Sequence, residues 1–319
     1  MNIVDHIPVL VNEAIAGLKI KKVGVFFDGT LGDGGFATEI LKKLQGGTFV
    51  GLDVDPQALE RSFNKIRSLK NFSKVSRRKE EFLLEDKNLK VFLLQRNFAQ
   101  IAEIVQEKNL GGIDGIVLDL GFSSFQLEES RRGFSFLKQE DLDMRFDPRL
   151  DNRASDIINQ LTKEELNEIF RFLGEEPLSR IIADTLVRQR RLKPIIKTQE
   201  LVEIVKDVYG KKYRYRSKRH PATRVFQALR IAVNDELRNL QQALNSSGKV
   251  LNFGGRLDVI SFHSLEDRIV KNFFKRSDFK IINKKPIIPS EDEKRQNPRS
   301  RSAKLRIGEK IKNGKKKNL

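Results

Sequence analysis

Cysteine is absent from this chain of 319 residues, and histidine occurs only three times. Without cysteine, disulfides, thiolate zinc sites and thiol nucleophiles are excluded. The histidines, His6, His220 and His263, are too widely spaced to show a metal-ligand pattern, so we expect no metal site. No apolar run reaches the roughly 18 residues that span a bilayer, and no charged-then-apolar signal segment begins the sequence. These absences predict a cytoplasmic protein with no membrane partner.

Acidic residues are in the minority: the chain has 43 aspartates and glutamates and 61 lysines and arginines, which gives a formal net charge of +18. Such an excess favours a polyanionic partner, because a basic surface neutralises many phosphates and releases their counterions. A general bias of composition towards basic residues is the alternative. The length predicts a sizeable core and more than one domain.

The first third of the chain alternates short apolar runs with amphipathic stretches, which is typical of a parallel sheet covered by helices. The apolar runs lack strict alternation, as strands covered on both faces do. They predict four successive strands: Val23–Asp28, Thr48–Asp53, Val91–Arg96 and Ile113–Asp119. The charged stretch NFSKVSRRKEEFLLEDKNLK, between the second and third strands, is interpreted as a surface insertion.

Helical periodicity dominates from about Phe122 to Arg219, and an ordinary crossover of this length is unusual. We therefore predict an inserted helical domain, with helices over Leu161–Leu173, Leu178–Arg191 and Gln199–Tyr209. After it, HPATRVFQALRIAVNDELRNLQQALNSSGKVL predicts one helix with a single apolar stripe. GGRLDVISF predicts a strand, and SLEDRIVKNFFK a helix that begins with a capping-box-like pair, Ser264 and Asp267.

The end of the chain predicts two terminal strands, Asp278–Asn283 and Ala303–Ile307, separated by a polar loop. The basic tail KIKNGKKKNL is expected to be disordered. The predicted division is an α/β core in two parts, 1–121 and 220–308, a helical domain at 122–219, and a basic disordered tail at 309–319.

A glycine-rich turn in VGVFFDGTLGDGGFATEIL joins the first predicted strand to a helix, an arrangement that holds nucleotide-like cofactors. Asp53 ends the second strand about twenty residues later, where a carboxylate can accept hydrogen bonds from ribose hydroxyls. The two features together predict an adenosine-type cofactor. They leave a dinucleotide-dependent dehydrogenase and an S-adenosylmethionine-dependent methyltransferase as open alternatives.

Asp119 ends the fourth strand, at the sheet edge where open α/β sheets bind ligands. A carboxylate there suits methyl transfer to an exocyclic base amine, because it accepts the hydrogens of a weakly nucleophilic nitrogen while Phe122 stacks on the base. A turn-forming role for Asp119 is the alternative. Methylation at C5 of a pyrimidine requires a cysteine nucleophile. Among nucleic-acid methylations, the sequence therefore favours nitrogen or oxygen acceptors.

Nine segments, in order and nearly end to end, resemble the bacterial small-subunit ribosomal RNA cytosine-N4 methyltransferase family. They are HIPVLVNEAI, DGTLGDGGFAT, LDVDPQAL, DGIVLDLGFSSFQL, RGFSF, LDMRFDP, HPATRVFQALRIAVNDEL, GGRLDVISFHSLEDRIVK and NPRSRSAKLR. The resemblance implies a class I methyltransferase fold, Rossmann-like and mostly parallel, with an inserted helical domain. It also implies S-adenosylmethionine as cofactor and N4 of a cytidine in the decoding region of small-subunit ribosomal RNA as target.

The family's cofactor positions fall on seven residues here: Gly34, Gly35, Phe36, Asp53, Phe98, Asp119 and Gln126. Asp119 is also the candidate catalytic residue. Two positions depart from the family pattern. Phe36 stands where histidine is common, which removes a side-chain role there, and Phe125 stands where proline is usual, close to Gln126.

Three further groups keep two interpretations each. Two of these groups are expected either to line a base pocket or to form ion pairs and a helix cap. They are Asp143, Arg145 and Asp147 in LDMRFDP, and His263, Glu266 and Asp267 in ISFHSLEDR. The segment KKYRYRSKRH, with Tyr213 and Tyr215 among basic residues, contacts RNA or is a solvated loop. An RNA-binding protein that keeps the fold without turnover is the alternative of a different functional class.

Overall fold

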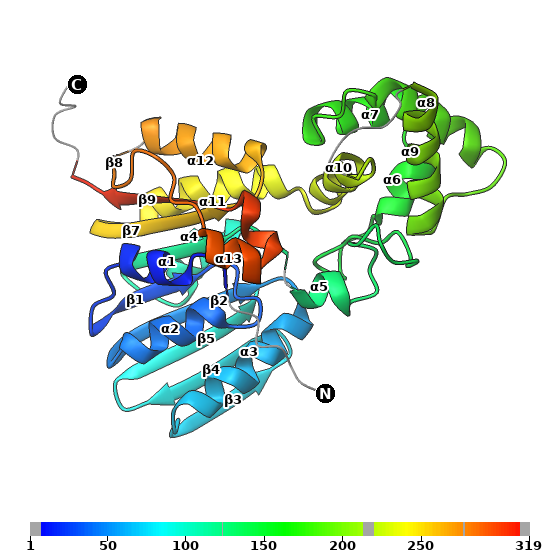
Figure 1. Cartoon of the computed structure of the whole chain (residues 1–319). Helices are drawn as coiled ribbons and strands as arrows, with labels where there is room; N and C mark the ends of the chain where they lie inside the picture. The colour runs from blue at the N-terminus through cyan, green and yellow to red at the C-terminus, as the bar shows by residue number, and fades with distance from the viewer. Residues whose placement is uncertain (1–7, 123, 213–219, 277, 313–319) are drawn as a thin grey trace. The chain divides into compact units, whose positions relative to one another are not determined.

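The computed structural model describes residues 8–122, 124–212, 220–276 and 278–312. The chain divides into two compact units: Met1–Gly121 with Leu237–Leu319, called here the sheet unit, and Phe122–Glu236, called the helical unit. Figure 1 shows the elements of both. No helix in the described ranges has the length and apolarity needed to cross a bilayer.

The sheet unit is built on one sheet, which has nine strands in the described residues, in the order β3-β4-β5-β2-β1-β6-β7-β9-β8. β5, β2, β1, β6 and β7 are parallel neighbours, while the strands at both edges pair antiparallel. The strands are β1 (Val23–Asp28), β2 (Gly46–Asp53), β3 (Lys74–Arg78), β4 (Glu81–Asp86), β5 (Leu89–Gln95), β6 (Ile113–Asp119), β7 (Leu251–Ser261), β8 (Phe279–Ile281) and β9 (Lys304–Lys310).

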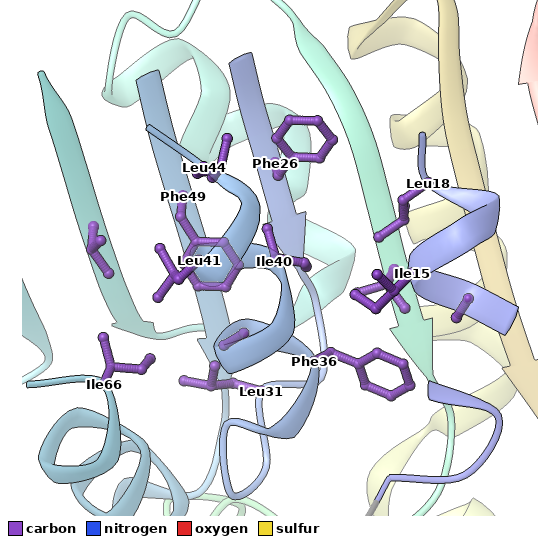
Figure 2. Close-up of a cluster of buried hydrophobic side chains, with 14 of the residues drawn as sticks. Ile15, Leu18, Phe26, Leu31, Phe36, Ile40, Leu41, Leu44, Phe49 and Ile66 are labelled. Atoms are coloured by element: carbon purple, nitrogen blue, oxygen red, sulfur yellow. The ribbon is translucent and has the colours of Figure 1, made fainter. Parts of the chain in front are cut away.

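Helices cover both faces of this sheet. One face carries α1 (Val11–Gly17), α2 (Gly35–Lys43) and α3 (Pro56–Leu69), and the other carries α4 (Ile101–Glu107), α11 (Glu236–Val250) and α12 (Ser264–Arg276). Successive side chains of a strand point to opposite faces. Phe26 therefore packs in the first core and Phe27 in the second, and Phe49 and Val50 on β2 divide in the same way. Figure 2 shows the first core.

The helical unit has a separate hydrophobic core. Its helices are α5 (Ser124–Glu128), α6 (Ala154–Gln160), α7 (Lys163–Glu168) with the π-helical turn η2 (Ile169–Leu173), α8 (Ser179–Arg190), α9 (Thr198–Lys212) and α10 (Thr223–Asn234). This unit extends to Glu236, not to residue 219, because Val225, Phe226 and Leu229 of α10 are buried in its core.

The single helix expected after His220 is two helices, α10 and α11. Asp235 between them has a φ of +48°, a left-handed conformation that aspartate tolerates better than most residues. The sequence predicted one helix because the apolar stripe continues across this break. Its two halves face different cores: Leu229 packs in the helical unit and Leu240 in the sheet unit.

Two segments for which no helix or strand was predicted contain regular structure. The stretch interpreted as a surface insertion forms the hairpin β3–β4, in which Phe82 and Leu84 are buried and alternate with partly exposed residues. The polar loop near the C-terminus contains α13 (Glu291–Gln296) and the 3-10 turn η3 (Pro298–Ser302). Glu293 of α13 accepts a hydrogen bond from the Leu10 N–H at 2.8 Å, which fixes this loop to the N-terminal segment.

The four predicted strands of the first third are β1, β2, β5 and β6 of the structure, and the predicted fold class is confirmed. The sheet is mostly parallel in its centre, with helices on both faces and an inserted helical unit. Residues 309 and 310, expected in a disordered tail, belong to β9. Residues 313–319 of that tail lie outside the described residues.

Candidate active site

Three neighbouring parallel strands end in an aspartate at the same edge of the sheet. Asp28 ends β1, Asp53 ends β2 and Asp119 ends β6. β1 lies between the other two strands. From β1 the chain order of the strands runs outwards in both directions, to β2 on one side and to β6 on the other, and open α/β sheets bind ligands at such a switch point. The sequence placed Asp53 and Asp119 here. It missed Asp28, whose signal was the same: an aspartate directly after a buried apolar run.

The turn after β1 is tied to both neighbouring strands. The Gly29 N–H donates to the Val117 carbonyl at 2.9 Å, and the Leu31 N–H donates to the Leu52 carbonyl at 2.8 Å. The Asp119 N–H donates to the Thr30 hydroxyl at 2.7 Å. Gly29 is closely packed, because a Cβ there would lie 2.4 Å from Cδ2 of Leu118. The turn is therefore held rigidly over the strand ends.

The same turn then opens α2. Gly32 and Gly34 have φ angles of +50° and +73°, which residues with a side chain rarely adopt. Gly34 is the N-cap of α2, and because glycine has no side chain it makes no side-chain cap on the first N–H groups of this helix. The Ser62 hydroxyl donates to the Gly32 carbonyl at 2.6 Å and fixes the turn from α3.

Asp53 connects the turn to β2. One carboxylate oxygen accepts from the Gly32 N–H at 2.8 Å, and the other accepts from the Asp55 N–H at 2.9 Å. A carboxylate has about four acceptor sites, so Asp53 keeps capacity for the hydroxyls of a ribose. Burial raises the pKa of Asp53 to about 6, and these backbone hydrogen bonds oppose that rise.

Asp28 and Asp119 each present a buried oxygen without a hydrogen-bond partner among the described residues, Oδ2 of Asp28 and Oδ1 of Asp119. Burial raises the pKa of Asp28 to about 7, and the nearby charge of Asp53 contributes to this rise. Burial also raises the pKa of Asp119 to about 8, with added repulsion from Asp28 and Glu266. Such unpaired acceptors favour a ligand that brings positive charge or hydrogen-bond donors.

Phe36 lies in the first turn of α2. Its side chain is 3% exposed and packs in the first core of the sheet unit, as Figure 2 shows. A contribution of this position to a ligand therefore comes from its backbone in the first turn of α2. Gly35, beside it, approaches Pro8 so closely that a Cβ would lie 2.1 Å from the proline ring.

Phe98 begins the 3-10 turn η1 (Phe98–Gln100) after β5, where Asn97 caps the turn. It is partly buried, and a Cβ on Gly29 would lie 3.2 Å from the Cβ of Phe98, so this residue borders the glycine turn. Gln126 belongs to the helical unit, where it is 7% exposed on α5. Phe122 is also in that unit, with the Arg230 guanidinium 5.1 Å from its ring centroid.

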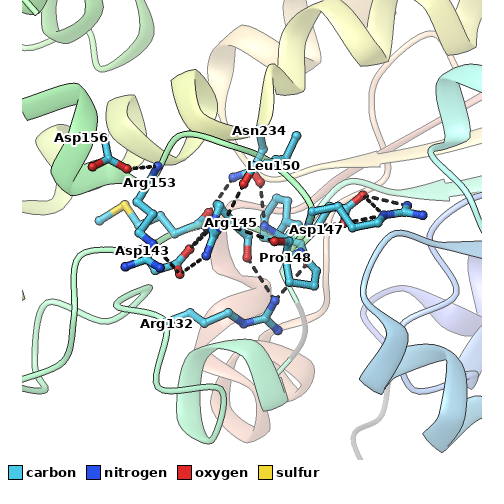
Figure 3. Close-up of polar contacts among 12 residues, drawn as sticks. Arg132, Asp143, Arg145, Asp147, Pro148, Leu150, Arg153, Asp156 and Asn234 are labelled. Atoms are coloured by element: carbon cyan, nitrogen blue, oxygen red, sulfur yellow. Dashed lines mark hydrogen bonds and ion pairs between the residues drawn. The ribbon is translucent and has the colours of Figure 1, made fainter. Parts of the chain in front are cut away.

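The residues of LDMRFDP form ion pairs within the helical unit (Figure 3). Asp143 accepts from Nε and Nη2 of Arg145 at 2.7 and 2.8 Å, and Asp147 pairs with Arg149. Arg145 also donates to the Leu150 carbonyl at 2.7 Å. Of the two interpretations left open by the sequence, these contacts favour the structural one.

The segment after β7 places His263 and Glu266 at the start of α12. Glu266 is 2% exposed and accepts from the backbone N–H groups of Phe262 and His263 at 2.8 and 3.3 Å. Asp267, expected at this cap, instead accepts from Arg306 Nε at 2.6 Å and pairs with Lys304. The segment KKYRYRSKRH is described only at its ends, and residues 213–219, with both tyrosines, lie outside the described residues.

Together these features make a site in which three acidic strand ends lie beside the glycine turn that begins α2. Asp53 can hold ribose hydroxyls, Phe98 offers an apolar surface for a base, and the free oxygens of Asp28 and Asp119 suit a cationic group. The residues fit a nucleoside that carries positive charge better than one that carries only phosphates.

A model of the MraW methylase family matches residues 3–311, nearly the whole chain and both units. The chain belongs to the MraW methylase family. Curated relatives agree with this membership. A ribosomal RNA small subunit methyltransferase H from Clostridioides difficile is 42% identical, covering 96% of this chain and 99% of its own length. A protein of the same name from Heliobacterium modesticaldum is 43% identical, with coverages of 96% and 98%.

Membership of the MraW methylase family confirms the resemblance identified from the nine sequence segments. It makes the chain a methyltransferase, and it selects between the two cofactor alternatives left open by the glycine turn. The acidic strand ends agree with that selection, since a dinucleotide pyrophosphate would add negative charge beside Asp28 and Asp119.

Proposed function

We propose that this methylase transfers a methyl group from S-adenosylmethionine to N4 of a cytidine in the decoding region of small-subunit ribosomal RNA. The observation that carries the proposal is the convergence of Asp28, Asp53 and Asp119 at the ends of β1, β2 and β6, in a chain of the MraW methylase family. The names of the relatives support small-subunit ribosomal RNA as substrate.

The proposed cofactor site comprises Gly34, Gly35, Phe36, Asp53, Phe98, Asp119 and Gln126. Asp53 binds the ribose, Phe98 packs on the adenine, and Phe36 contributes its backbone. When bound, S-adenosylmethionine supplies an electrophilic methyl group on a sulfonium. The free Asp28 and Asp119 oxygens favour this positive charge.

Asp119 is the proposed catalytic residue. The amino nitrogen of cytosine is a weak nucleophile because its lone pair is delocalised into the ring. Asp119 Oδ1 accepts a hydrogen of this amine, which orients the lone pair and stabilises the positive charge that develops on nitrogen. The hydrogen bond from the Asp119 N–H to Thr30 holds the residue in position.

Mass spectrometry of nucleosides tests the proposal. Small ribosomal subunits or their RNA, treated with the protein and S-adenosylmethionine, should gain N4-methylcytidine and no 5-methylcytidine, because the chain has no cysteine nucleophile. Absence of methyl incorporation would favour an RNA-binding protein without turnover. Tighter binding of NAD than of S-adenosylmethionine would favour a dehydrogenase.

Substitution of Asp119 tests its role. Asp119→Ala should lower kcat by about 10²–10³-fold, the range for loss of one preorganised electrostatic contact. Asp114→Ala is the matched control, because Asp114 lies on the same strand but accepts from Val25 and Lys21. Cofactor affinity is measured alongside. Near-normal kcat of Asp119→Ala at saturating cofactor would remove Asp119 from the catalytic mechanism.

A further inference from the structure

The segment that follows β7 emerges beside Asp119. β6 and β7 are parallel neighbours in which Asp119 pairs with Ile260. The Leu120 N–H donates to the Ile260 carbonyl at 2.9 Å, and a Cβ on Gly121 would lie 3.0 Å from the ring of Phe262. The two chains therefore remain in contact beyond the ends of their strands. His263, the next residue, belongs to the same edge of the sheet as Asp119.

His263 is held by reciprocal hydrogen bonds at the start of α12. Glu266 Oε2 accepts from the backbone N–H of His263, while the backbone N–H of Glu266 donates to His263 Nδ1 at 3.4 Å. The His263 side chain is 10% exposed. This arrangement resembles a capping box in which the histidine ring takes the place of the usual serine or threonine hydroxyl. It fixes the orientation of the imidazole.

The hydrogen bond to Nδ1 determines what the other ring nitrogen presents. Because Nδ1 accepts, the proton of the neutral imidazole is on Nε2. Nε2 lies 3.1 Å from Oε1 of Glu266, yet it has no hydrogen-bond partner of suitable geometry in the described part of the chain. His263 thus offers an oriented, buried N–H donor that no group in the described ranges satisfies.

This donor shares a site with a free acceptor. Asp119 Oδ1 is also buried without a partner among the described residues. The charge of Glu266, which contacts His263, is close enough to raise the pKa of Asp119. Buried polar groups of proteins are nearly always hydrogen-bonded, so an unpaired donor and acceptor at one sheet edge indicate a ligand with the complementary pair.

Cytosine presents such a pair on its Watson–Crick edge: the N4 amine donates and the adjacent N3 accepts. Resting on the proposed function, we infer that His263 determines base specificity by donating from Nε2 to N3 of the target cytosine, while Asp119 accepts from N4. Uracil has the opposite pattern, with an N3–H donor and an O4 acceptor. It would leave both protein groups unsatisfied, and His263 therefore contributes to the rejection of uracil.

Two amide variants separate this role from the structural role of the ring. In His263→Asn, the side-chain oxygen can replace Nδ1 and keep the hydrogen bond from the Glu266 N–H, but no donor reaches the position of Nε2. In His263→Gln, the longer side chain brings an N–H donor close to that position. The two variants therefore differ mainly in whether an N–H donor lies near the position of Nε2.

The experiment measures binding to small ribosomal subunits reconstituted with RNA that carries either cytidine or 3-deazacytidine at the target position. The analogue keeps the N4 amine and replaces N3 by a C–H group. Equilibrium binding in the presence of S-adenosylhomocysteine is the readout, because the analogue also alters the nucleophilicity of the amine. The wild-type protein should bind the analogue about ten- to hundredfold more weakly than cytidine, as expected for one lost base contact.

His263→Asn should bind both subunits with equal affinity, and His263→Gln should keep a preference for cytidine. Unchanged S-adenosylmethionine affinity in both variants confirms an intact fold. The inference is overturned if the wild-type protein does not distinguish the two bases, or if His263→Asn distinguishes them as strongly as the wild type. Failure of the proposed function is seen separately, as a wild-type protein that forms no N4-methylcytidine on the unmodified subunit.

Discussion

At the scale of single residues, the site is dominated by carboxyl groups that the fold buries without full compensation. Asp28 is completely buried, and one of its oxygens has no partner in the described residues. Burying such a group is unfavourable unless a ligand supplies charge or hydrogen bonds. The residues that prepare the site for its cofactor therefore lower the stability of the free protein.

This burial makes stability depend on pH. The pKa of Asp28 is about 7 in the folded protein, against 3.8 ordinarily, so between these values the folded chain holds a proton that the unfolded chain has released. The free energy of unfolding therefore falls as pH rises, by up to about 1.4 kcal/mol per pH unit for one such group, and levels off above pH about 7. Asp28→Asn removes this contribution.

Urea denaturation of the cofactor-free protein at several values between pH 5 and 8 checks the prediction. Asp28→Asn should gain stability relative to the wild type as pH rises through this range. The same difference between the two proteins at every pH would contradict the assigned cause.

Asp53 should contribute directly to cofactor affinity. Asp53→Ala removes a charged acceptor for the ribose and should weaken S-adenosylmethionine binding by about 1.5–3 kcal/mol, measured by calorimetry. Asp33→Ala is the matched control in the same turn, because Asp33 accepts from Arg61 at 2.8 Å and does not end a strand. Unchanged affinity in a folded Asp53→Ala protein would assign Asp53 a structural role.

At the scale of elements, α10 fixes the loop that contains LDMRFDP. Asn234 is 9% exposed, and its side-chain oxygen accepts from the Phe146 N–H at 2.7 Å. Its amide nitrogen donates to the carbonyls of Met144 and Arg230 at 2.8 and 2.9 Å. One side chain thus satisfies backbone groups of a loop almost ninety residues earlier in the chain, as Figure 3 shows.

Replacement of Asn234 should therefore destabilise the helical unit. Asn234→Ala leaves buried backbone groups unsatisfied and should lower the free energy of unfolding by about 1–3 kcal/mol. Hydrogen exchange should accelerate in residues 142–150 and in α10. S-adenosylmethionine affinity should not change, since the proposed ribose ligand Asp53 lies in the sheet unit. Unaltered exchange in that loop would show that its other contacts hold it in place without Asn234.

At the scale of the whole molecule, the net charge of +18 predicts an electrostatic contribution to RNA binding. Replacing Lys211, Lys212, Arg214 and Arg216 with glutamine should weaken binding at low salt. Each lost phosphate contact should flatten the plot of log affinity against log salt by about 0.7–0.9.

The control for this experiment replaces Lys79 and Lys87, exposed residues at the β3–β4 hairpin, and should leave the slope nearly unchanged. Salt titrations of RNA binding by filter retention give both slopes. If the quadruple variant keeps the wild-type slope, the basic segment is a solvated loop and the phosphate contacts belong to other surfaces.

The sequence by itself determined the class of fold and the positions of Asp53 and Asp119. Buried parallel strands require long apolar runs, and the turn after β1 requires glycine, so both leave local signals. The resemblance rested on nine such local segments, and family membership confirmed it. Asp28 has the same local signal, because it also ends a buried apolar strand.

Only the tertiary structure decided what depends on distant contacts. It divided one apolar stripe between two cores at Asp235, and it turned the side chain of Phe36 into the core. Through the pairing of β6 with β7, it also brought Glu266 of α12, which contacts His263, close enough for its charge to raise the pKa of Asp119. Periodicity and spacing report which residues are apolar and where strands end. Which polar atoms remain unpaired depends on neighbours more than a hundred residues away, and these meet only in the folded chain.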